Sequence, residues 1–176
     1  VSGWSGTSHC TGQVVSCFDQ DGLLNIFQSG HPWLPRGAGC SYGDAALLSG
    51  GTMVLPTFED RLSSIGKDFQ ITASSSITVS ELLARLSLIG CTLPVVPGVL
   101  GATLGGMLAA DIHGKNHFQM GSLGRWVRSL SLMIPSGEVL ECSEQNEPEI
   151  FRATLGGMGL TGVIPSACLE VVGCCR

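Results

Sequence analysis

The chain has 176 residues, of which 13% are charged, and its net charge at pH 7 is −5. This length allows one domain, or two small lobes that share a core, and the hydrophobic fraction of 44% excludes a disordered chain. Lysine and arginine form no cluster, so neither a nucleic-acid surface nor an anionic-membrane surface is expected. Glycine is abundant at 25 residues but follows no fixed period, which excludes collagen and solenoid repeats.

The first half of the chain contains short apolar segments separated by polar loops. Residues 21–29 are predicted to form a helix, because four apolar residues would share one of its faces. A second helix is predicted over residues 81–88, with Ser80 as its N-cap and Gly90 just beyond its end. Two short strands are predicted between these helices, at residues 52–56 and 70–73.

The segment from Leu86 to Ala110 contains no charged side chain and is long enough to span a bilayer. Seven glycines and prolines within it would, however, leave backbone groups unpaired in lipid. We therefore interpret the segment as buried loops and a short helix, and we predict no transmembrane segment.

A hairpin is predicted in the second half, where residues 127–134 and 139–142 alternate between apolar and polar and residues 135–138 have the composition of a turn. A short helix over residues 147–154 and a closing strand over residues 163–172 are expected to follow. Because strands and helices do not alternate regularly, the predicted fold class is α+β, with mixed or antiparallel sheets, rather than a doubly wound sheet.

Three glycine-rich loops, at residues 36–44, 97–106 and 156–162, carry the main functional signal. Glycine lets the backbone approach a ligand closely, and successive N–H groups in such a turn can hold a pyrophosphate without a lysine. In the second loop, residues 103–106 open an apolar helix whose first N–H groups could face the same anion. Each loop alone is more simply a tight turn, but the three together predict a cofactor site formed mainly by main chain.

Residues 157–162 of the third loop formally match the G-x-G-x-x-G pattern. In a nicotinamide site this pattern follows a strand and opens a helix. Here a helix is predicted before it and a strand after it, so a Rossmann-type nicotinamide site is not expected.

A polar string, Asp-Ile-His-Gly-Lys-Asn-His, follows the second loop directly at residues 111–117. His113 and His117 have the i, i+4 spacing that could bind a metal from one helical face. The glycine and asparagine between them disfavour a helix and no third ligand is suitably spaced, so metal binding is the minor interpretation. His113, beside Lys115, is better placed to contact a ligand than the other histidines are.

Eight cysteines could form a disulfide framework, but most of them lie in apolar, strand-like contexts, as free buried cysteines do. No Cys-x-x-Cys pair is repeated, so a structural zinc site is not expected. Reduced thiols and a cytoplasmic protein are therefore predicted.

Five motifs together resemble the FAD-binding domain of the vanillyl-alcohol-oxidase superfamily, the PCMH-type domain. The resemblance extends from Gly3 to about Val172, and the polar string at residues 111–117 is its most diagnostic part. Within the superfamily the chain is most similar to the oxidases that act on the 2′-hydroxyl of decaprenylphosphoryl-β-D-ribose. The motifs are Arg36–Asp44, Pro97–Gly98, Thr103–Gly106, Ala110–His117 and Ala153–Gly162.

The resemblance implies two α+β lobes, at about residues 9–57 and 58–173, with FAD in the cleft between them. The loop of the first lobe would hold the pyrophosphate, and His113 and Lys115 would be catalytic residues near the flavin and the substrate pocket. The FAD-binding residues that it implies are Pro35, Arg36, Gly37, Ala38, Gly39, Cys40, Ser41, Tyr42, Gly43, Asp44, Ala45, Gly98, Thr103, Leu104, Gly105, Gly106, Ala110, Asp111, Ile112, His113 and Ile164.

The activity implied is the oxidation of an alcohol carbon by hydride transfer to FAD. The expected substrate is a small-molecule sugar or a polyprenyl-phosphoryl sugar, and a lipid-linked substrate would bring the protein to the membrane. Many relatives carry at the position of Cys40 a histidine joined covalently to the flavin, so the binding implied here is non-covalent.

Family enzymes continue into a substrate domain that supplies a tyrosine and a lysine, and the chain is expected to need such a domain, or a reductase partner, for turnover. The alternatives are a non-catalytic flavin-binding module and a fragment of an FAD-dependent sugar-lactone oxidase.

Overall fold

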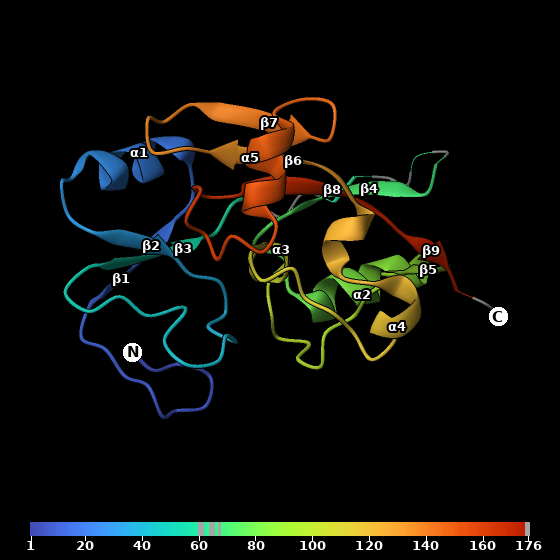
Figure 1. Cartoon of the computed structure of the whole chain (residues 1–176), viewed down its shortest axis with the longest axis horizontal. Coiled ribbons are helices and arrows are strands. Elements are labelled where there is room, and N and C mark those ends of the chain that lie inside the picture. Colours follow the sequence, from blue (N-terminus) through green and yellow to red (C-terminus); the bar gives the residue numbers. More distant parts are fainter. Residues whose placement is uncertain (60–61, 64–65, 67, 175–176) are drawn as a thin grey trace.

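Two β-sheets of different character organise the chain (Figure 1). The computed structural model describes residues 1–59, 62–63, 66 and 68–174. A parallel sheet is formed within residues 13–56 and an antiparallel sheet within residues 70–170. The predicted α+β class is confirmed.

The parallel sheet has the order β1-β3-β2, built from β1 (Gln13–Cys17), β3 (Thr52–Pro56) and β2 (Trp33–Pro35). Helix α1 (Gln20–Gln28) connects β1 to β2, close to the predicted range. It begins where the Asp19 carboxylate accepts a hydrogen bond from the N–H of Gly22 at 2.8 Å. It packs on the sheet through buried Leu23 and through Phe27, whose ring stacks on Trp33 with centroids 4.3 Å apart.

The antiparallel sheet has the order β4-β8-β6-β7. The predicted hairpin is confirmed, since β6 and β7 pair with Leu132 opposite Leu140. The predicted strand over residues 163–172 is too long: it divides into β8 and a short β9, which pairs with β5 in a separate two-stranded sheet. The strands are β4 (Gln70–Ser74), β5 (Cys91–Thr92), β6 (Val127–Met133), β7 (Val139–Ser143), β8 (Ser166–Glu170) and β9 (Val172–Gly173).

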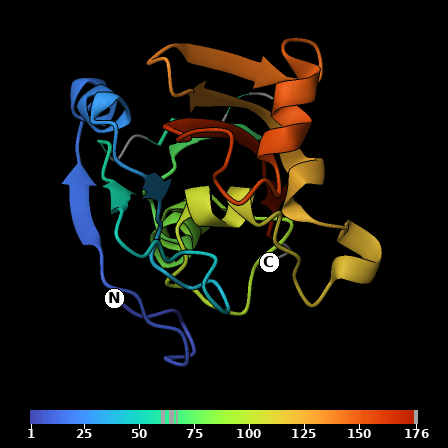
Figure 2. The ribbon, with the colours of Figure 1, turned by 60° about the vertical axis from the view of Figure 1, so that its left-hand side comes forward.

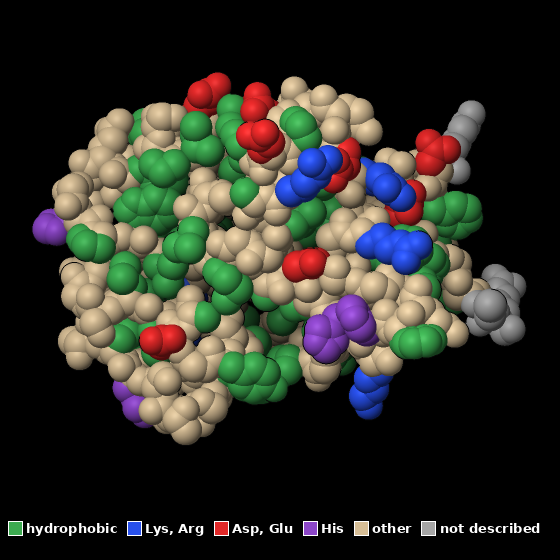
Figure 3. All heavy atoms as spheres, in the orientation of Figure 1, with side chains coloured by type: hydrophobic (Ala, Val, Ile, Leu, Met, Phe, Trp, Pro, Cys, Tyr) green, Lys and Arg blue, Asp and Glu red, His purple; other side chains and the backbone are tan. Residues whose placement is uncertain are grey.

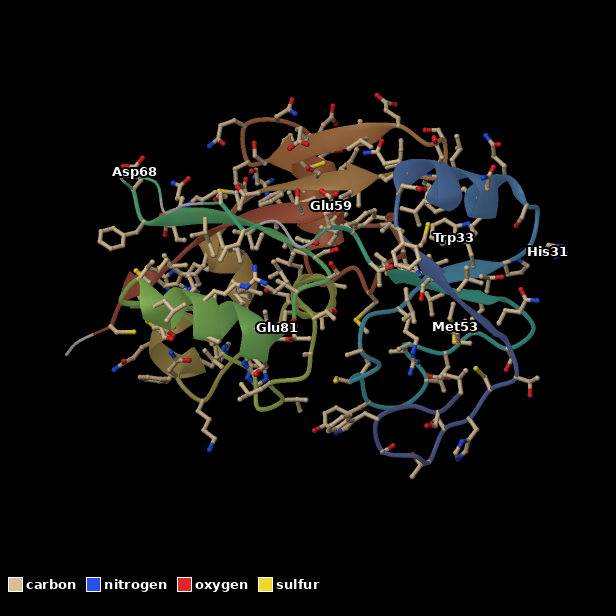
Figure 4. All side chains as sticks on the ribbon, turned by 180° about the vertical axis from the view of Figure 1, so that it is seen from behind. His31, Trp33, Met53, Glu59, Asp68 and Glu81 are labelled. Atoms are coloured by element: carbon tan, nitrogen blue, oxygen red, sulfur yellow. The ribbon has the colours of Figure 1, made fainter. Side chains whose placement is uncertain are left out.

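Helix α2 (Val79–Leu88) begins earlier than predicted, and its N-cap is Thr78 rather than Ser80. The Thr78 hydroxyl accepts a hydrogen bond from the N–H of Glu81 at 3.3 Å, and a Glu81 carboxylate oxygen accepts one from the N–H of Thr78 at 2.9 Å. This reciprocal capping box requires a carboxylate three residues after the cap, a condition that Thr78 meets. Glu81 is labelled at the start of this helix in Figure 4.

The uncharged segment before Asp111 contains the short helix α3 (Leu104–Ala109), but the prediction that its loops are buried is only partly correct. It begins with the end of α2 and includes β5, and Leu88, Ile89 and Leu100 are exposed. Helix α3 lies between the parallel sheet and the antiparallel sheet in both Figure 1 and Figure 2. Among the described residues, no helix has the length and apolar character needed to cross a membrane. The other helices are α3 (Leu104–Ala109), α4 (His117–Met120), the 3-10 helix η1 (Leu123–Trp126) and α5 (Pro148–Thr154).

The larger hydrophobic core lies between the antiparallel sheet and helices α2 and α3, and contains Leu82, Leu104 and Leu130. A smaller core beneath the parallel sheet contains Leu23 and Val54. Figure 3 shows that charged side chains gather along the top and the upper right of one face, over the antiparallel sheet, and are sparser elsewhere on that face.

The seven cysteines that the structure describes are all free thiols. Cys17, Cys91 and Cys142 are buried on strands, as predicted for apolar strand-like positions. Cys174 is exposed, and Cys175 lies outside the described residues.

Candidate functional site

A cavity of about 690 Å³ brings together segments that are far apart in the sequence. It lies where the parallel sheet, α3 and the last glycine-rich loop meet, and each of the three glycine-rich loops contributes to its wall. The lining residues are Trp4, Pro35, Arg36, Gly37, Ala38, Gly39, Cys40, Ser41, Tyr42, Ala45, Ala46, Leu55, Pro56, Thr57, Ser75, Ser76, Pro97, Gly98, Val99, Ala102, Thr103, Gly105, Gly106, Met107, Ala109, Ala110, Ile112, Met158, Gly159, Gly162, Val163 and Ile164.

The first loop follows β2 and is held in shape by Arg36. The Arg36 guanidinium donates hydrogen bonds to the carbonyl oxygens of Ala46 and Ser2. Gly39 lies directly over this side chain: it has a φ of 71°, and a Cβ there would collide with the guanidinium. The shape of the loop therefore depends on both residues: Arg36 makes the hydrogen bonds, and only glycine at position 39 leaves room for its guanidinium.

The main-chain N–H groups of residues 37–43 are the feature of this loop that could bind a ligand. Within the described residues none of them donates a hydrogen bond to the protein. All but Gly43 belong to residues that line the cavity. A row of unpaired main-chain N–H groups on a loop is typical of anion-binding nests, and it needs no lysine.

The second loop meets the first at α3. A Cβ on Gly37 would lie 2.3 Å from the hydroxyl oxygen of Thr103, so only glycine allows this approach of the first loop to the second. Gly98 and Gly106 face open space on the cavity side: a Cβ on Gly98 would meet nothing within 4 Å, and one on Gly106 only the Thr103 hydroxyl at 3.3 Å. The wall is smooth here because these positions lack side chains.

The first N–H groups of α3 are not available to an anion, contrary to our expectation. The N–H groups of Leu104 and Gly105 donate to the carbonyl oxygens of Ile77 and Ser75 at 2.9 and 2.8 Å. The N–H of Gly106 donates to the Thr103 hydroxyl at 3.2 Å. The two carbonyl groups lie on the segment after β4, whereas Thr103 is the N-cap of α3 itself, and together they satisfy the N-terminus of the helix.

The third loop, residues 156–162, follows α5 and precedes β8, so the rejection of a Rossmann-type site agrees with the structure. It nevertheless forms part of the cavity wall through Met158, Gly159 and Gly162. Gly159 has a φ of 79°, and a Cβ there would lie 2.7 Å from a Pro35 ring carbon. This contact ties the last loop to the first.

The polar string divides into residues that anchor it and residues that are exposed. Ile112 lines the cavity, whereas His113 and Lys115 are exposed and are not among its lining residues. Asn116 donates its side-chain N–H to the carbonyl oxygen of Pro94 at 2.8 Å and so anchors the string. Asp111 accepts a hydrogen bond from the N–H of Gly124.

The histidine pair of the string is close but lacks further ligands. The rings of His113 and His117 have centroids 5.2 Å apart, and His117 begins α4 while His113 lies outside any helix. In the part of the chain that the structure describes, no three His, Cys, Asp or Glu side chains are grouped closely enough to hold a metal.

Most of the predicted site residues lie together in the cavity wall. Leu104 does not line it because its side chain is fully buried in the larger core. The predicted residues outside the wall are Gly43, Asp44, Leu104, Asp111, His113 and Lys115.

Several lining residues were missed by the sequence analysis. Ser75 and Ser76 follow β4, and Leu55 to Thr57 ends β3 and continues beyond it. Neither segment is rich in glycine, so neither carried a local signal; only the packing of the two sheets brings them to the cavity.

The comparison with protein families identifies the family of the chain. A family model described as an FAD binding domain matches residues 23–143, more than half of the chain. The chain belongs to this family, the PCMH-type FAD-binding domains of the vanillyl-alcohol-oxidase superfamily. FAD is its cofactor.

Individual relatives are flavoprotein oxidases and dehydrogenases. The chain is 33% identical over 97% of its length to decaprenylphosphoryl-beta-D-ribose oxidase of Mycolicibacterium smegmatis, of which it covers 39%. It is 26% identical over 97% of its length to the mitochondrial L-galactono-1,4-lactone dehydrogenase 2 of rice, covering 30% of it. It is 31% identical over 77% of its length to L-gulonolactone oxidase of mouse, of which it covers 31%. The chain thus spans well under half the length of these relatives.

The cavity wall fits FAD by its chemistry. The unpaired N–H groups of residues 37–43 suit a pyrophosphate, and the side-chain-free surface at Gly98 and Gly106 suits a flat ring. Cys40 is half-buried in the wall and is the only thiol among its described lining residues; burial raises its pKa, and the nearby Arg36 guanidinium offsets this only in part. The thiol is therefore neutral near pH 7.

Proposed function

We propose that this chain is the FAD-binding part of an oxidoreductase that oxidises a hydroxyl of a sugar or of a polyprenyl-phosphoryl sugar. The observation that carries the proposal is the cavity in which three glycine-rich loops meet, with the unpaired N–H groups of residues 37–42 in its wall. The likeness to decaprenylphosphoryl-beta-D-ribose oxidase, at 33% identity over 97% of the chain, supports this choice of substrate class.

In this proposal the pyrophosphate lies on the loop from Pro35 to Ala45. The flavin lies against the glycine-lined wall formed by Gly98, Thr103, Gly105 and Gly106. Ala110, Ile112 and Ile164 complete the contacts with FAD. When bound, FAD supplies a hydride acceptor.

His113 and Lys115 are proposed as the catalytic residues. Both are exposed and lie outside the cavity wall, on the loop that follows the lining residue Ile112. An imidazole nitrogen of His113 would take the proton of the substrate hydroxyl, and the Lys115 ammonium would orient the same hydroxyl. We expect a substrate domain, in the same polypeptide or from a partner, to close the other side.

A sugar lactone is the second candidate substrate. It is favoured by the likeness to L-galactono-1,4-lactone dehydrogenase and L-gulonolactone oxidase at 26% and 31% identity. The two candidates share the cavity and differ only in what the substrate side must recognise.

Anaerobic reduction of the bound flavin tests the proposal. The FAD-loaded protein, alone and with a family substrate domain added, is mixed with a polyprenyl-phosphoryl ribose or with an aldonolactone, and the flavin absorbance is followed. Bleaching by the phosphoryl ribose in the presence of the added domain is the expected result. Bleaching by the lactone but not by the phosphoryl ribose would favour the second candidate. Absence of bleaching by either would leave a non-catalytic flavin-binding module.

A further inference from the structure

Asp111 is one of four residues other than glycine with a positive φ in the described chain, at 40°. This left-handed conformation strains most side chains and is tolerated best by Asp and Asn. The residue follows Ala110, the C-cap of α3, and precedes Ile112; both neighbours line the cavity, and Asp111 does not.

The carboxylate of Asp111 is used on the other side of the turn. Its Oδ1 accepts a hydrogen bond from the N–H of Gly124, in η1, at 2.7 Å in a partly buried position. A Cβ on Gly124 would lie 2.8 Å from the same oxygen, so this approach requires glycine there. Hydrogen bonds that involve a carboxylate are among the stronger ones in proteins.

This hydrogen bond closes the neck of the loop that runs from residue 112 to residue 123. Next to it, the N–H of Leu123 donates to the carbonyl oxygen of Ile112 at 2.8 Å, and His113 and Ser122 form an isolated antiparallel bridge. The loop carries His113 and Lys115, so these contacts at its neck fix the backbone from which both side chains extend.

We propose that Asp111 is a positioning residue, whose carboxylate locks the neck of this loop and thereby places Ile112 in the cavity wall and His113 and Lys115 at its rim. Asp111 does not itself contact FAD. The proposal rests on the proposed function for the roles of His113 and Lys115, but the lock is a property of the protein alone.

Three substitutions separate the two features of Asp111. Asp111→Asn keeps an Oδ1 acceptor and tolerates the left-handed backbone. Asp111→Gly keeps the backbone but removes the acceptor, and Asp111→Ala removes the acceptor and adds strain. Glu147, at a φ of 52° and with no side-chain cap hydrogen bond, provides a matched control as Glu147→Ala, because it shares the strained backbone without the lock.

The measurements are hydrogen exchange of the Gly124 amide by NMR and the dissociation constant for FAD. In Asp111→Asn both should stay within about twofold of the wild-type values. In Asp111→Gly the Gly124 amide should exchange about tenfold faster, as expected for the loss of one hydrogen bond to a charged group, and FAD should bind more weakly. Asp111→Ala should show larger changes in the same directions, and Glu147→Ala should leave both quantities unchanged.

Two results would overturn the proposal. Unchanged Gly124 exchange in Asp111→Gly would show that there is no lock. Loss of FAD binding in Asp111→Asn with a protected Gly124 amide would show that the carboxylate charge acts on the cofactor directly. The variants could show the expected order of Gly124 exchange rates and FAD affinities while neither candidate substrate reduces the flavin, even with a substrate domain added. That result would contradict only the proposed function, because the exchange measurement uses no substrate.

Discussion

Arg36 shows how a single side chain can prepare a cofactor loop. Its guanidinium joins the start of the loop to Ala46 and to Ser2, and it lies beneath Gly39. It therefore fixes the loop and also places a positive charge under the N–H groups of residues 37–43. Both effects should favour a pyrophosphate.

Arg36→Met is therefore expected to weaken FAD binding by about tenfold or more, the usual effect of losing hydrogen bonds made by a charged group. Riboflavin, which lacks the pyrophosphate, should lose much less affinity. Arg36→Lys should fall between, because lysine keeps the charge and loses the forked geometry. Fluorescence titration with both ligands gives the ratio, and an equal loss for the two would contradict the electrostatic role.

Cys40 gives a prediction about attachment. Burial raises the pKa of its thiol and so disfavours the thiolate that would attack the flavin, and we expect FAD to be bound without a covalent bond. Acid precipitation of the FAD-loaded protein should release all the yellow colour to the supernatant, from the wild type and from Cys40→Ser alike. Flavin retained in the pellet of the wild type but not of Cys40→Ser would identify Cys40 as an attachment point and refute this.

At the scale of the elements, the start of α2 is the most local test of the fold. Thr78→Ala removes the hydroxyl that caps the helix and should lower the free energy of unfolding by about 1 kcal/mol. Ser80→Ala, at the position that the sequence alone suggested, should have almost no effect. Urea denaturation of both variants makes the comparison, and an equal loss in the two would contradict the capping box.

The same box has a pH dependence with a defined sign. The Thr78 hydroxyl, and then the Thr78 N–H, lower the pKa of the Glu81 carboxyl from its ordinary value. A group whose pKa is lower in the folded state stabilises the protein above its unfolded pKa, and this contribution disappears as pH falls through the folded pKa. The stability difference between wild type and Thr78→Ala should therefore shrink in acid; a difference that grows would contradict the assignment.

Elements with a strong local pattern could be predicted from the sequence, and those without one could not. Helix α1, the hairpin of β6 and β7 and the start of β4 follow from periodicity and turn composition. Strand β1 is exposed at every residue except Cys17, so no buried face alternates along it. The first two N–H groups of α3 donate to the carbonyl oxygens of Ile77 and Ser75. These acceptors lie outside the helix, so no pattern within α3 could predict them.

At the scale of the whole molecule, the buried thiols link stability to pH. Burial raises the pKa of Cys17, Cys40 and Cys142 above the ordinary value of a thiol. The folded state therefore favours the protonated form, and the free energy of unfolding should fall as pH rises through and beyond that value. Denaturation under reducing conditions at neutral and alkaline pH measures this slope. Cys142→Ala should flatten it, and the same slope in that variant would contradict the role of this thiol.

The cavity itself depends on the whole fold, since its walls come from the parallel sheet, α3 and the loop before β8. The sequence identified the glycine-rich loops because glycine marks close approach wherever the partner lies. It could not show that His113 and Lys115 lie outside the cavity wall, because that depends on the closure of the loop by Gly124 and Ser122.

The central claim, that FAD occupies this cavity, is tested most directly by titrating FAD into Gly106→Val and Gly101→Val. Both glycines are exposed, and a Cβ meets nothing within 4 Å at Gly101 and only the Thr103 hydroxyl at 3.3 Å at Gly106, but only Gly106 lines the cavity. We predict that Gly106→Val folds but loses FAD binding, because its side chain takes the space of the flavin, while Gly101→Val binds FAD like the wild type. Unchanged FAD affinity in a folded Gly106→Val protein would contradict the placement of the cofactor.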